Sequence, residues 1–481
     1  MKKIFALLCF KWYFHKHQYA KALSFLEKYT CTNDEILACY LLGMYETVAN
    51  STWDERDIRA GFAIAVSLSA CGRFKEAEAI ISRLTCRKGF DNYRIKLSIA
   101  IAFYMPLLAL KLAKDNAPLD FHVSLLLKNR EIDKAKELLR FITDKNDKKL
   151  DMSEAQLYLL TSNVIANSPS QQLDFLNRFF ISYGLDTVTL KDTCKPLSVI
   201  NLKSKTKRTV EGCLVSILVT VYNTADYIFS SIESLLAQTY KNIEIIVVDD
   251  CSTDDTPNIV RKIAMSESRV KYHRLSHNVG TFAAKTIGFQ YALGDFVVCH
   301  DSDDWLHPQH VEIQMSPLLQ DEELVATASY WVRIDNNGIY SAHSNYPLLR
   351  LNRTTLLFRK KRVLEEMGLW DIVRIGADSE FYVRMKLVFG QKAVRQIKMP
   401  LTIGAYRENS LMTSIDTGNG SKGISPIRLA YWEAWTRWHI DSFKKGEKPI
   451  MTNWTKTDPK RPFLAPKNII TPSDILKRYF L

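Results

Sequence analysis

The most informative chemical feature of this chain is an acidic tetrapeptide at 301–304, Asp-Ser-Asp-Asp, directly after the apolar run 296–299. Such a run predicts a strand. Its acidic end would then lie at the carboxyl edge of a sheet, where open α/β folds bind ligands. Carboxylate oxygens are hard ligands that suit Mg²⁺ or Mn²⁺ carrying a diphosphate. An isolated Asp-x-Asp is weak evidence, because acidic loops are common and usually only solvated, so the surrounding elements decide its meaning.

Strand and helix patterns alternate before this acidic tetrapeptide. Residues 215–222 and 243–248 are near-continuously apolar and rich in β-branched side chains, which is typical of buried strands. Between them, residues 228–236 carry apolar side chains at helical spacing. A shorter strand is expected at 270–275 and a helix at 281–293. This alternation predicts a Rossmann-like α/β fold with a mostly parallel, doubly wound sheet.

Four segments of this region resemble the nucleotide-binding half of the family-2 glycosyltransferases, which have the GT-A fold. The segments are Val-Ser-Ile-Leu-Val-Thr-Val-Tyr-Asn at 215–223, Ile-Val-Val-Asp-Asp-Cys-Ser-Thr-Asp at 246–254, Asn-Val-Gly at 278–280 and the acidic tetrapeptide at 301–304. Four ordered segments at strand ends are more specific than any single motif. The resemblance extends from near Cys213 to near Ser414. It implies an inverting, metal-dependent sugar transfer from a nucleotide-sugar.

The resemblance implies a donor pocket along the carboxyl edge of the sheet. Asp249 or Asp250 would accept the N3–H of uracil, and Asp250 fits that role better; the alternative is a turn or helix-capping aspartate. Asp301 would face the ribose and the metal. Asp303 would be the main ligand of the Mn²⁺ or Mg²⁺ ion that stabilises the departing UDP. The remaining expected contacts with the nucleotide-sugar come from Thr220, Tyr222, Asn223 and Ser302.

Lys285 stands where the family usually has an arginine, because the triplet at 284–286 is Ala-Lys-Thr. A lysine can contact a phosphate as a point charge, without the bidentate geometry of an arginine. The competing interpretation is a solvated lysine on the surface of a helix, so the sequence leaves two roles open for this residue.

Residues 376–384, Gly-Ala-Asp-Ser-Glu-Phe-Tyr-Val-Arg, resemble the family's helix start E-D-x-x-x-x-x-R. The match implies that Asp378 is the general base that takes the acceptor proton, although Ala377 replaces the usual Glu. A carboxylate at a helix N-terminus also interacts favourably with the helix dipole, which is the alternative reason for its presence. Because the dipole keeps such a pKa low, the basicity has to come from desolvation in the ternary complex. Glu380 is the second candidate for the base.

Further acceptor-side candidates come from aromatic and polar residues downstream. Trp305 is a candidate wall for stacking a sugar, although an aromatic residue after a turn more often packs in a core. The segment Tyr-Arg-Glu-Asn at 406–409 resembles a family segment Y-R-x-H, whose His joins the metal site. Arg407 and Asn409 are therefore candidates, with Asn409 offering a carbonyl oxygen as a weaker ligand. Three nearby histidines lack a paired spacing and are expected to be ordinary loop residues: His277, His300 and His307.

The composition fits a globular protein of two or three domains. The chain has 481 residues, of which 47% are hydrophobic and 24% charged. Nine cysteines are scattered without paired spacing, which indicates a reducing compartment. The N-terminal apolar run is interrupted by Lys11 and has no small-residue cleavage site, and no run reaches transmembrane length. We therefore expect a cytoplasmic protein, with peripheral contact at the inner membrane face as an option.

The formal net charge of +13 calls for an anionic partner or another reason. Nucleic acid is not expected, because the basic residues are dispersed and no nucleic-acid motif occurs. An anionic nucleotide-sugar, an anionic membrane surface or an acidic glycan fits better. The C-terminal residues 474–481 combine bulky apolar side chains with two cations, which fits either contact with a membrane interface or a packed final helix.

The first 200 residues differ in kind from the rest, because they contain repeated amphipathic helix patterns and few strand signals. Related segments recur at 19–22, 74–77 and 132–135, each with an aromatic or aliphatic residue three positions before an Ala. They resemble degenerate tetratricopeptide-type helix pairs, which would bind a protein partner, mediate self-association or only pack. The expected domains are a helical solenoid at 1–200, a linker at 201–212, a GT-A domain at 213–415 and a basic, partly helical extension at 416–481.

Three functions are compatible with these patterns. The leading one is an inverting glycosyltransferase that moves a sugar from a UDP-sugar to a glycan or lipid-linked acceptor, in the synthesis of a bacterial-type capsule or lipopolysaccharide. The second is a helical scaffold with an inactive transferase domain, against which the complete acidic set of Asp250, Asp301, Asp303 and Asp378 argues. The third is a nucleotidyltransferase. That class usually has a Gly-rich, basic phosphate loop after the first strand, and the loop at 222–226 has neither feature.

Overall fold

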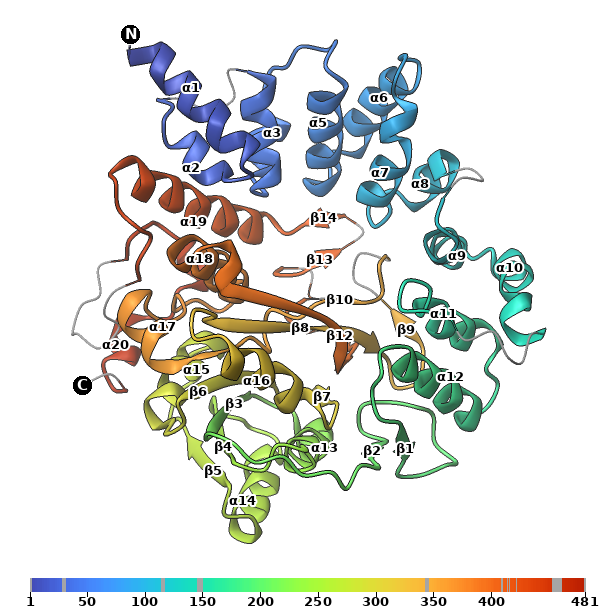
Figure 1. The fold of residues 1–481 in the computed structure, drawn as a ribbon, viewed down its shortest axis with the longest axis vertical. Coiled ribbons are helices and arrows are strands. Elements are labelled where there is room, and N and C mark those ends of the chain that lie inside the picture. The colour runs from blue at the N-terminus through green and yellow to red at the C-terminus, as the bar shows by residue number, and fades with distance from the viewer. Residues whose placement is uncertain are drawn as a thin grey trace.

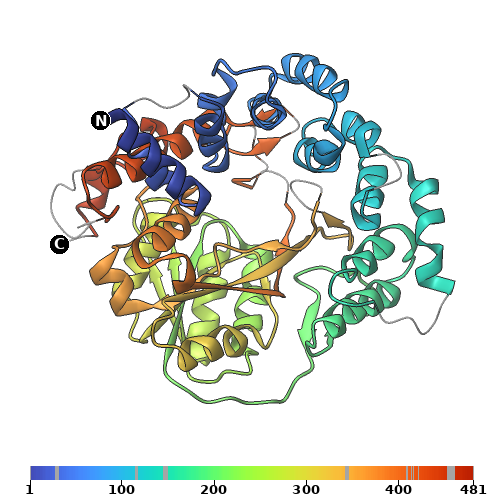
Figure 2. The ribbon, with the colours of Figure 1, turned by 45° about the horizontal axis from the view of Figure 1, so that its top comes forward.

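A helical N-terminal region curls around a domain built on one large mixed sheet (Figure 1). The computed structural model describes residues 2–27, 32–113, 117–144, 150–341, 346–407, 410–412, 414, 416–420, 422–451 and 461–479. In Figure 2 the helical region leads away from the C-terminal helix α19 (Pro426–Lys444) and returns to the far end of the sheet, so that the chain forms a ring. Among the helices of the described residues, none is both long and apolar enough to cross a membrane.

The predicted helical character of the N-terminal region is confirmed. The described helices are α1 (Lys2–His15), α2 (Tyr19–Leu23), α3 (Asn33–Leu41), α4 (Tyr45–Ala49), α5 (Ile58–Ala70), α6 (Phe74–Thr85), α7 (Asp91–Ile101), α8 (Pro106–Ala113), α9 (Leu119–Lys128), α10 (Ile132–Asp144), α11 (Gln156–Ile165) and α12 (Pro169–Ser182). The three recurring segments begin α2, α6 and α10. Their alanines, Ala22, Ala77 and Ala135, are fully buried, so each small side chain lets a neighbouring helix approach closely.

The large sheet has the strand order β5-β4-β3-β6-β11-β8-β12-β7, with β9 and β10 paired to β8. Its strands are β3 (Val215–Val221), β4 (Ile243–Asp249), β5 (Val270–Arg274), β6 (Phe296–Asp301), β7 (Trp305–Leu306), β8 (Ala326–Ile334), β9 (Tyr340–Ser341), β10 (Arg350–Leu351), β11 (Leu357–Arg359) and β12 (Val394–Ala405). The four strands from β5 to β6 are parallel, as predicted. Beyond β6 the sheet is mixed, because β11 runs antiparallel to both of its neighbours. The predicted α/β architecture is confirmed, with the parallel part of the sheet running from β5 to β6.

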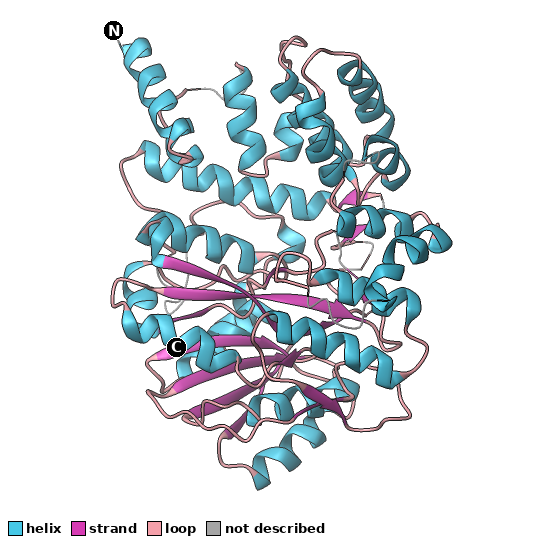
Figure 3. Cartoon of the chain, turned by 45° about the vertical axis from the view of Figure 1, so that its right-hand side comes forward, coloured by secondary structure: helices cyan, strands magenta, loops and turns pink. Residues whose placement is uncertain are grey.

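Helices cover both faces of this sheet (Figure 3). On one face, Ile217 and Val219 of β3 pack in a core with α13 (Ala225–Leu236) and α16 (His310–Gln320). On the other face, Leu218 packs in a core with α15 (Thr281–Tyr291) and α18 (Ala377–Phe389). The remaining described helices of this domain are α14 (Thr256–Ser266), α17 (Lys360–Glu366) and α20 (Ser473–Leu476). β3 and β4 are buried along their whole length, which explains their continuous apolar sequence.

The two ends of the helical region are fixed to the sheet domain by polar contacts. At one end, the carboxylate of Glu433 on α19 accepts hydrogen bonds from the backbone N–H (2.8 Å) and the hydroxyl (2.6 Å) of Thr47. At the other end, Asn163 of α11 exchanges two hydrogen bonds of 2.7 Å with the backbone of Tyr340. A small hairpin, β1 (Val188–Leu190) with β2 (Leu202–Ser204), then leads into the sheet domain. The helical region is therefore held at both ends.

The C-terminal segment packs on the sheet domain. Leu476 is buried, and the hydroxyl of Tyr479 accepts hydrogen bonds from the backbone N–H groups of Ser276 (2.9 Å) and His277 (3.1 Å). Of the two interpretations of residues 474–481, the packed final helix therefore holds for the described residues up to 479, and a membrane contact through this segment is not supported.

Candidate active site

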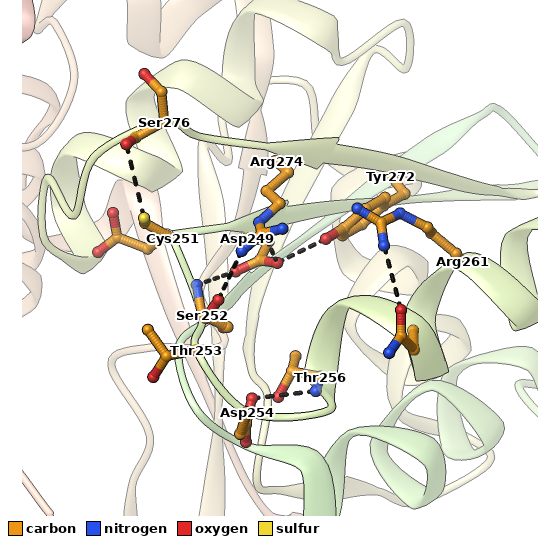
Figure 4. A network of polar contacts seen from close by, with 12 residues as sticks. Asp249, Cys251, Ser252, Thr253, Asp254, Thr256, Arg261, Tyr272, Arg274 and Ser276 are labelled. Carbon is orange, nitrogen blue, oxygen red and sulfur yellow. Dashed lines mark hydrogen bonds and ion pairs between the residues drawn. The ribbon is translucent and has the colours of Figure 1, made fainter.

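Asp249 and Asp250, the acidic pair at the end of β4, have different roles. Asp249 is completely buried and accepts hydrogen bonds from Ser252 N–H (2.7 Å) and the Tyr272 hydroxyl (2.6 Å), with the Arg274 guanidinium 3.7 Å away (Figure 4). These contacts hold the turn after β4, so Asp249 is the turn aspartate of the two alternatives and does not fit a ligand contact. The prediction that it binds the nucleotide-sugar is therefore not supported by its geometry.

Asp250 lies next to the sheet edge and holds a neighbouring loop. Its two carboxylate oxygens accept hydrogen bonds from the backbone N–H groups of Val279 (2.6 Å) and Gly280 (2.8 Å). Burial raises the pKa of Asp250 to about 6, although these two hydrogen bonds and the nearby Arg374 oppose the shift. The resemblance segment Asn-Val-Gly at 278–280 is thus tied directly to Asp250. The raised pKa means that this carboxyl group changes charge near pH 6.

The end of β3 forms the next part of the edge. The Thr220 hydroxyl lies 2.9 Å from the Thr281 hydroxyl at the start of α15. Asn223 has a positive φ of 51°, and its side-chain oxygen accepts a hydrogen bond of 2.8 Å from Thr253 N–H. Tyr222 between them is half exposed. Thr220 and Asn223 therefore shape the edge, whereas Tyr222 presents an aromatic ring to solvent there.

Lys285 connects α15 with the acidic tetrapeptide. Its Nζ lies 3.3 Å from Oδ1 of Asp301, and only 3% of the residue is exposed. Burial alone would lower the pKa of Lys285, but the charges of Asp301, Cys299 and Asp378 and the hydrogen bond to Asp301 together outweigh it, and the pKa is raised. The same pair lowers the pKa of Asp301 against the effect of its own burial. Lys285 is therefore a charged, buried cation at the site, and the interpretation as a solvated surface lysine is wrong.

Asp303 and Asp304 have different surroundings. Nε of Arg407 donates to Oδ2 of Asp303 at 2.7 Å, and burial still raises the pKa of Asp303. Asp304 is buried, with Oδ1 accepting from Ala405 N–H at 3.1 Å. Its Oδ2 has no partner among the described residues, and burial together with the charges of Asp303 and Asp301 raises the pKa of Asp304 well above its usual value. Ser302, the fourth member of the tetrapeptide, is buried.

Asp378 meets this cluster from the other half of the domain. It lies in the first turn of α18, which follows Gly376 in a left-handed conformation (φ 78°). The negative charge of Asp378 acts on Lys285 and on Arg428; burial still lowers the pKa of Arg428, and the charge of Asp378 opposes that shift. Lys285 contacts Asp301 of β6 directly, and the charge of Asp378 of α18 also acts on it. The predicted donor-side and acceptor-side carboxylates therefore both act on one buried cation.

Two acceptor-side predictions are wrong. Glu380 is completely buried, where it pairs with Arg384 (2.7 Å) and accepts from His439 (3.0 Å), so it cannot reach an acceptor. Trp305 is 2% exposed and lies in the core between β7 and β12, so it cannot stack on a sugar. Glu380 lies in the first turn of α18 with its side chain toward the core, and Trp305 lies on the core side of β7. Asn409 lies outside the described residues.

The histidines near the site are packed or hydrogen-bonded within the protein. His300 and His307 are buried, and burial lowers the pKa of each to about 4. His300 contacts the Ser231 hydroxyl (2.9 Å), and His307 contacts the Asp186 carbonyl (2.9 Å). In the described part of the chain, no group of three or more His, Cys, Asp or Glu side chains could hold a metal ion. The expectation that these histidines are not ligands fits this arrangement, although they lie in the core and not in loops.

Sequence reasoning missed a group of arginines close to the acidic cluster. The positive charge of Arg333 on β8 acts on Asp301, Asp303 and Asp304. Arg374 donates to both the side chain and the backbone carbonyl of Asn278, beside the loop held by Asp250. The available sequence signal for Arg333 was its alternation with the aromatic Trp331 along a strand. No local signal pointed to Arg374, since it precedes α18 in an irregular segment.

Comparisons with known proteins agree with this geometry. A family model described as "Glycosyl transferase family 2" matches residues 216–375. An uncharacterized glycosyltransferase of Rickettsia felis is 26% identical over 234 residues, 48% of this chain and 37% of that protein. The putative glycosyltransferase EpsH of Bacillus subtilis is 40% identical over 129 residues, 27% of this chain and 37% of that protein. These alignments span little more than a third of either relative.

Two further relatives have more specific names. The UDP-Glc:alpha-D-GlcNAc-diphosphoundecaprenol beta-1,3-glucosyltransferase WfaP of Escherichia coli is 34% identical over 131 residues, 28% of this chain and 51% of WfaP. The crystal structure of S. aureus TarS 1-349 in complex with UDP-GlcNAc has 21% identity and a TM-score of 0.34, over 41% of this chain and 59% of that one. Residues 216–375 of this chain are therefore similar to glycosyltransferase family 2.

Proposed function

We propose that the protein is an inverting glycosyltransferase that moves a sugar from a nucleotide-sugar to a glycan or lipid-linked acceptor. The observation that carries the proposal is the buried Lys285, which contacts Asp301 directly and on which the charge of Asp378 also acts. An inverting transfer needs a cationic place for the leaving diphosphate and a base on the opposite side of the reacting carbon. Residues from the two halves of the domain are candidates for both roles.

The two carboxylates at 301 and 303 fit a divalent cation. Lys285 donates to Oδ1 of Asp301, and Arg407 donates to Oδ2 of Asp303; among the described residues no hydrogen bond or ion pair involves the other oxygen of either carboxylate. Mg²⁺ and similar hard ions are commonly held by one or two carboxylates together with substrate phosphates. When bound, such an ion supplies positive charge to the departing nucleoside diphosphate. Asp301 and Asp303 are the residues that would hold it.

The protein's own residues would divide the chemistry as follows. Lys285 places a permanent positive charge beside the position of the diphosphate. Asp378 accepts the proton of the attacking acceptor hydroxyl, and its charge acts on Lys285 and Arg428. Binding of the acceptor excludes water and thereby raises the basicity of Asp378. A single displacement with one base inverts the anomeric carbon, so an α-linked donor gives a β-linked product.

We extend the proposal to a UDP-sugar donor and to surface polysaccharide synthesis. The name of WfaP includes a UDP-sugar donor and a diphospholipid-linked acceptor, and this relative aligns with the part of the chain that contains the acidic edge. Asp250 and the exposed ring of Tyr222 lie where a uracil would be recognised by its N3–H and its π face. These two residues support the choice of a uridine nucleotide.

A peripheral membrane contact through α1 would suit a lipid-linked acceptor. Ile4, Leu8 and Trp12 recur at helical spacing on its outer face and are 68%, 62% and 52% exposed, with Phe5 beside them at 67%. Residues 1–26 contain five lysines and no acidic residue. An apolar helical face flanked by lysines is typical of helices that lie in an anionic membrane interface. Flotation with phosphatidylglycerol vesicles tests this, and equal flotation of Leu8→Glu/Trp12→Glu would disprove it.

A transfer assay separates the three candidate functions. The full chain is incubated with UDP-, GDP- and dTDP-sugars, with Mn²⁺ or with a chelator, and released nucleoside diphosphate is measured with and without acceptors. A glycosyltransferase releases UDP from one sugar donor, and the release depends on the metal ion. A nucleotidyltransferase instead forms pyrophosphate from a nucleoside triphosphate and a sugar phosphate. A folded chain that does neither, and binds no nucleotide, would support the scaffold.

A further inference from the structure

Strand β8 presents an aromatic and cationic face next to the acidic cluster. Val332 and Ile334 point into the core shared with α11 and α12, so the alternating residues Trp331 and Arg333 lie on the opposite face. The guanidinium of Arg333 stacks over the indole of Trp331 at 4.2 Å from the ring centroid. Gly404 on the adjacent strand makes room for the indole, because a Cβ there would lie 2.9 Å from it. The ring of Trp331 is partly exposed.

Two more arginines extend this face toward α18. Arg350 on β10 pairs directly with Trp331 in the antiparallel ladder, so both side chains lie on the same face of the sheet. Arg353 follows three residues later. Its Nη1 donates to the Ser379 hydroxyl at 3.0 Å, and its guanidinium lies 5.7 Å from the centroid of Tyr382. Ser379 is the residue after Asp378. The three arginines therefore line the route from the acidic tetrapeptide to the proposed base.

Two members of this group have a buried nitrogen atom without a partner among the described residues, although the charge of Arg333 also acts on Asp301, Asp303 and Asp304. Arg333 and Arg353 form no ion pair with any described residue, and the buried Nε of each has no hydrogen-bond partner there. Asp301 and Asp303 are already paired with Lys285 and Arg407. Burial lowers the pKa of Arg350, and the charges of Arg353 and Arg333 lower it further. Like charges held together in a partly buried place are unfavourable unless a ligand compensates them.

The helical region completes the surroundings of the arginines. Burial raises the pKa of Tyr45 at the start of α4, and the charge of Arg353 opposes that shift. Burial also raises the pKa of Tyr104, in the turn between α7 and α8, and the charge of Arg350 opposes that shift. Hydroxyl groups from the N-terminal helices thus lie close to guanidinium groups from the sheet domain. Figure 2 shows the helices curling around this side of the sheet.

We propose that Arg333, Arg350 and Arg353 bind a phosphate or diphosphate group of the acceptor, with Trp331 as the surface on which the adjoining sugar stacks. Several guanidinium groups offer more N–H donors than the two oxygens of a single carboxylate can accept, whereas a phosphate has enough oxygens. Sugars present C–H faces that pack on aromatic rings. The inference rests on the proposed function, because it assigns these residues to the acceptor of the same reaction. It adds that the acceptor is anionic and that the helical region takes part in binding it.

The first experiment measures phosphate binding without requiring turnover. The full chain is saturated with UDP and Mg²⁺, so that the donor pocket is filled, and is titrated with inorganic phosphate in a calorimeter. Arg333→Gln and Arg353→Gln should each weaken phosphate binding about ten- to a hundred-fold, the loss expected for one charged hydrogen-bonding partner. The matched control is Arg395→Gln, an exposed arginine on β12 that pairs with Asp321. Circular dichroism confirms that each variant is folded.

The outcomes separate this inference from the proposed function. Unchanged phosphate affinity in both folded variants overturns the site, whatever the activity. Loss of UDP affinity in these variants also overturns it, because the arginines would then belong to the donor diphosphate. Selective loss of phosphate binding supports the site even if no sugar transfer is detected, in which case only the proposed function fails.

A second experiment identifies the source of the phosphate. Transfer is compared among three acceptors with the same terminal sugar: a lipid diphosphate, a phosphorylated water-soluble oligosaccharide and a neutral alkyl glycoside. The inference expects KM for the preferred phosphorylated acceptor to rise at least about tenfold in Arg353→Gln, with the neutral glycoside little affected. Preference for the lipid diphosphate over the phosphorylated oligosaccharide, or the reverse, names the source. Equal use of all three by the unmodified protein overturns the inference.

Discussion

Nζ of Lys285 lies 3.3 Å from Oδ1 of Asp301 and joins the first turns of α15 to the end of β6. Because Lys285 is almost fully buried while the Asp301 side chain is 36% exposed, this contact is a partly buried charge pair and not a fully exposed surface salt bridge. Removing the cation leaves the Asp301 carboxylate without its main partner. The pair therefore contributes both to the stability of the edge and to the field that a donor diphosphate meets.

The first prediction concerns this cation. Lys285→Met should weaken UDP binding at least about tenfold, because one charged contact with the diphosphate is lost while the side-chain volume is kept. Lys271→Met is the control, since Lys271 pairs with Glu244 at a distance from the edge. UDP binding by calorimetry provides the measurement. Equal affinity in Lys285→Met and the unchanged protein would remove Lys285 from the donor pocket.

Sequence patterns predicted the strands from β3 to β6 well, because their apolar runs end in polar turns that need no tertiary information. They could not decide the role of Lys285, since its burial depends on how α15 docks against β6. The roles of Trp305 and Glu380 were missed for the same reason: the core faces of β7 and α18 are set by β12 and by His439 of α19. The sequence could not predict the position of Arg350, because the two-residue strand β10 is defined only by its pairing with β8 in the folded chain.

The second prediction tests the metal assignment. Asp303→Ala should abolish Mn²⁺-dependent transfer and weaken UDP binding in the presence of Mn²⁺, since one of two carboxylate ligands is lost. The fold should persist, because the partner Arg407 is 29% exposed and can be solvated. Asp295→Ala, at an exposed position before β6, is the control. Turnover that is unchanged in Asp303→Ala would disprove the assignment.

The third prediction concerns the contact between the helical region and α19. Glu433→Ala removes the acceptor of two hydrogen bonds from Thr47 and leaves Arg437 without its carboxylate partner, although its hydrogen bond to Thr47 remains; this should destabilise the protein by about 1–3 kcal/mol. Thermal unfolding measures the change, with Glu447→Ala as an exposed control. Deletion of residues 1–200 would uncover Ile440, which packs on those helices, and Trp432, which donates to the Leu42 carbonyl, so point variants are the cleaner test. An unfolding temperature equal to that of the unchanged protein would refute the prediction.

The fourth prediction uses the raised pKa of Asp250. Between about pH 5 and 7 this carboxyl, with a pKa of about 6 in the folded protein, loses its proton as the pH rises. Only the ionised form is a full acceptor for the N3–H of uracil, so affinity for the base should increase with pH across this window. Uridine is the suitable ligand, since it lacks phosphates that would titrate in the same range. Saturation-transfer NMR should show the increase in the unchanged protein and a flat profile in Asp250→Asn.

The fifth prediction distinguishes a catalytic carboxylate from a structural one two residues away. Asp378→Asn is nearly isosteric but cannot accept a proton, so kcat should fall by about two to four orders of magnitude while UDP binding is kept. Glu380→Gln instead disturbs a fully buried pair with Arg384, so it should lower the free energy of unfolding by about 3–5 kcal/mol. Single-turnover rates and denaturant unfolding separate the two effects. A normal rate in Asp378→Asn would show that another group removes the acceptor proton. A product with the donor's anomeric configuration would show that the displacement is not a single inverting step.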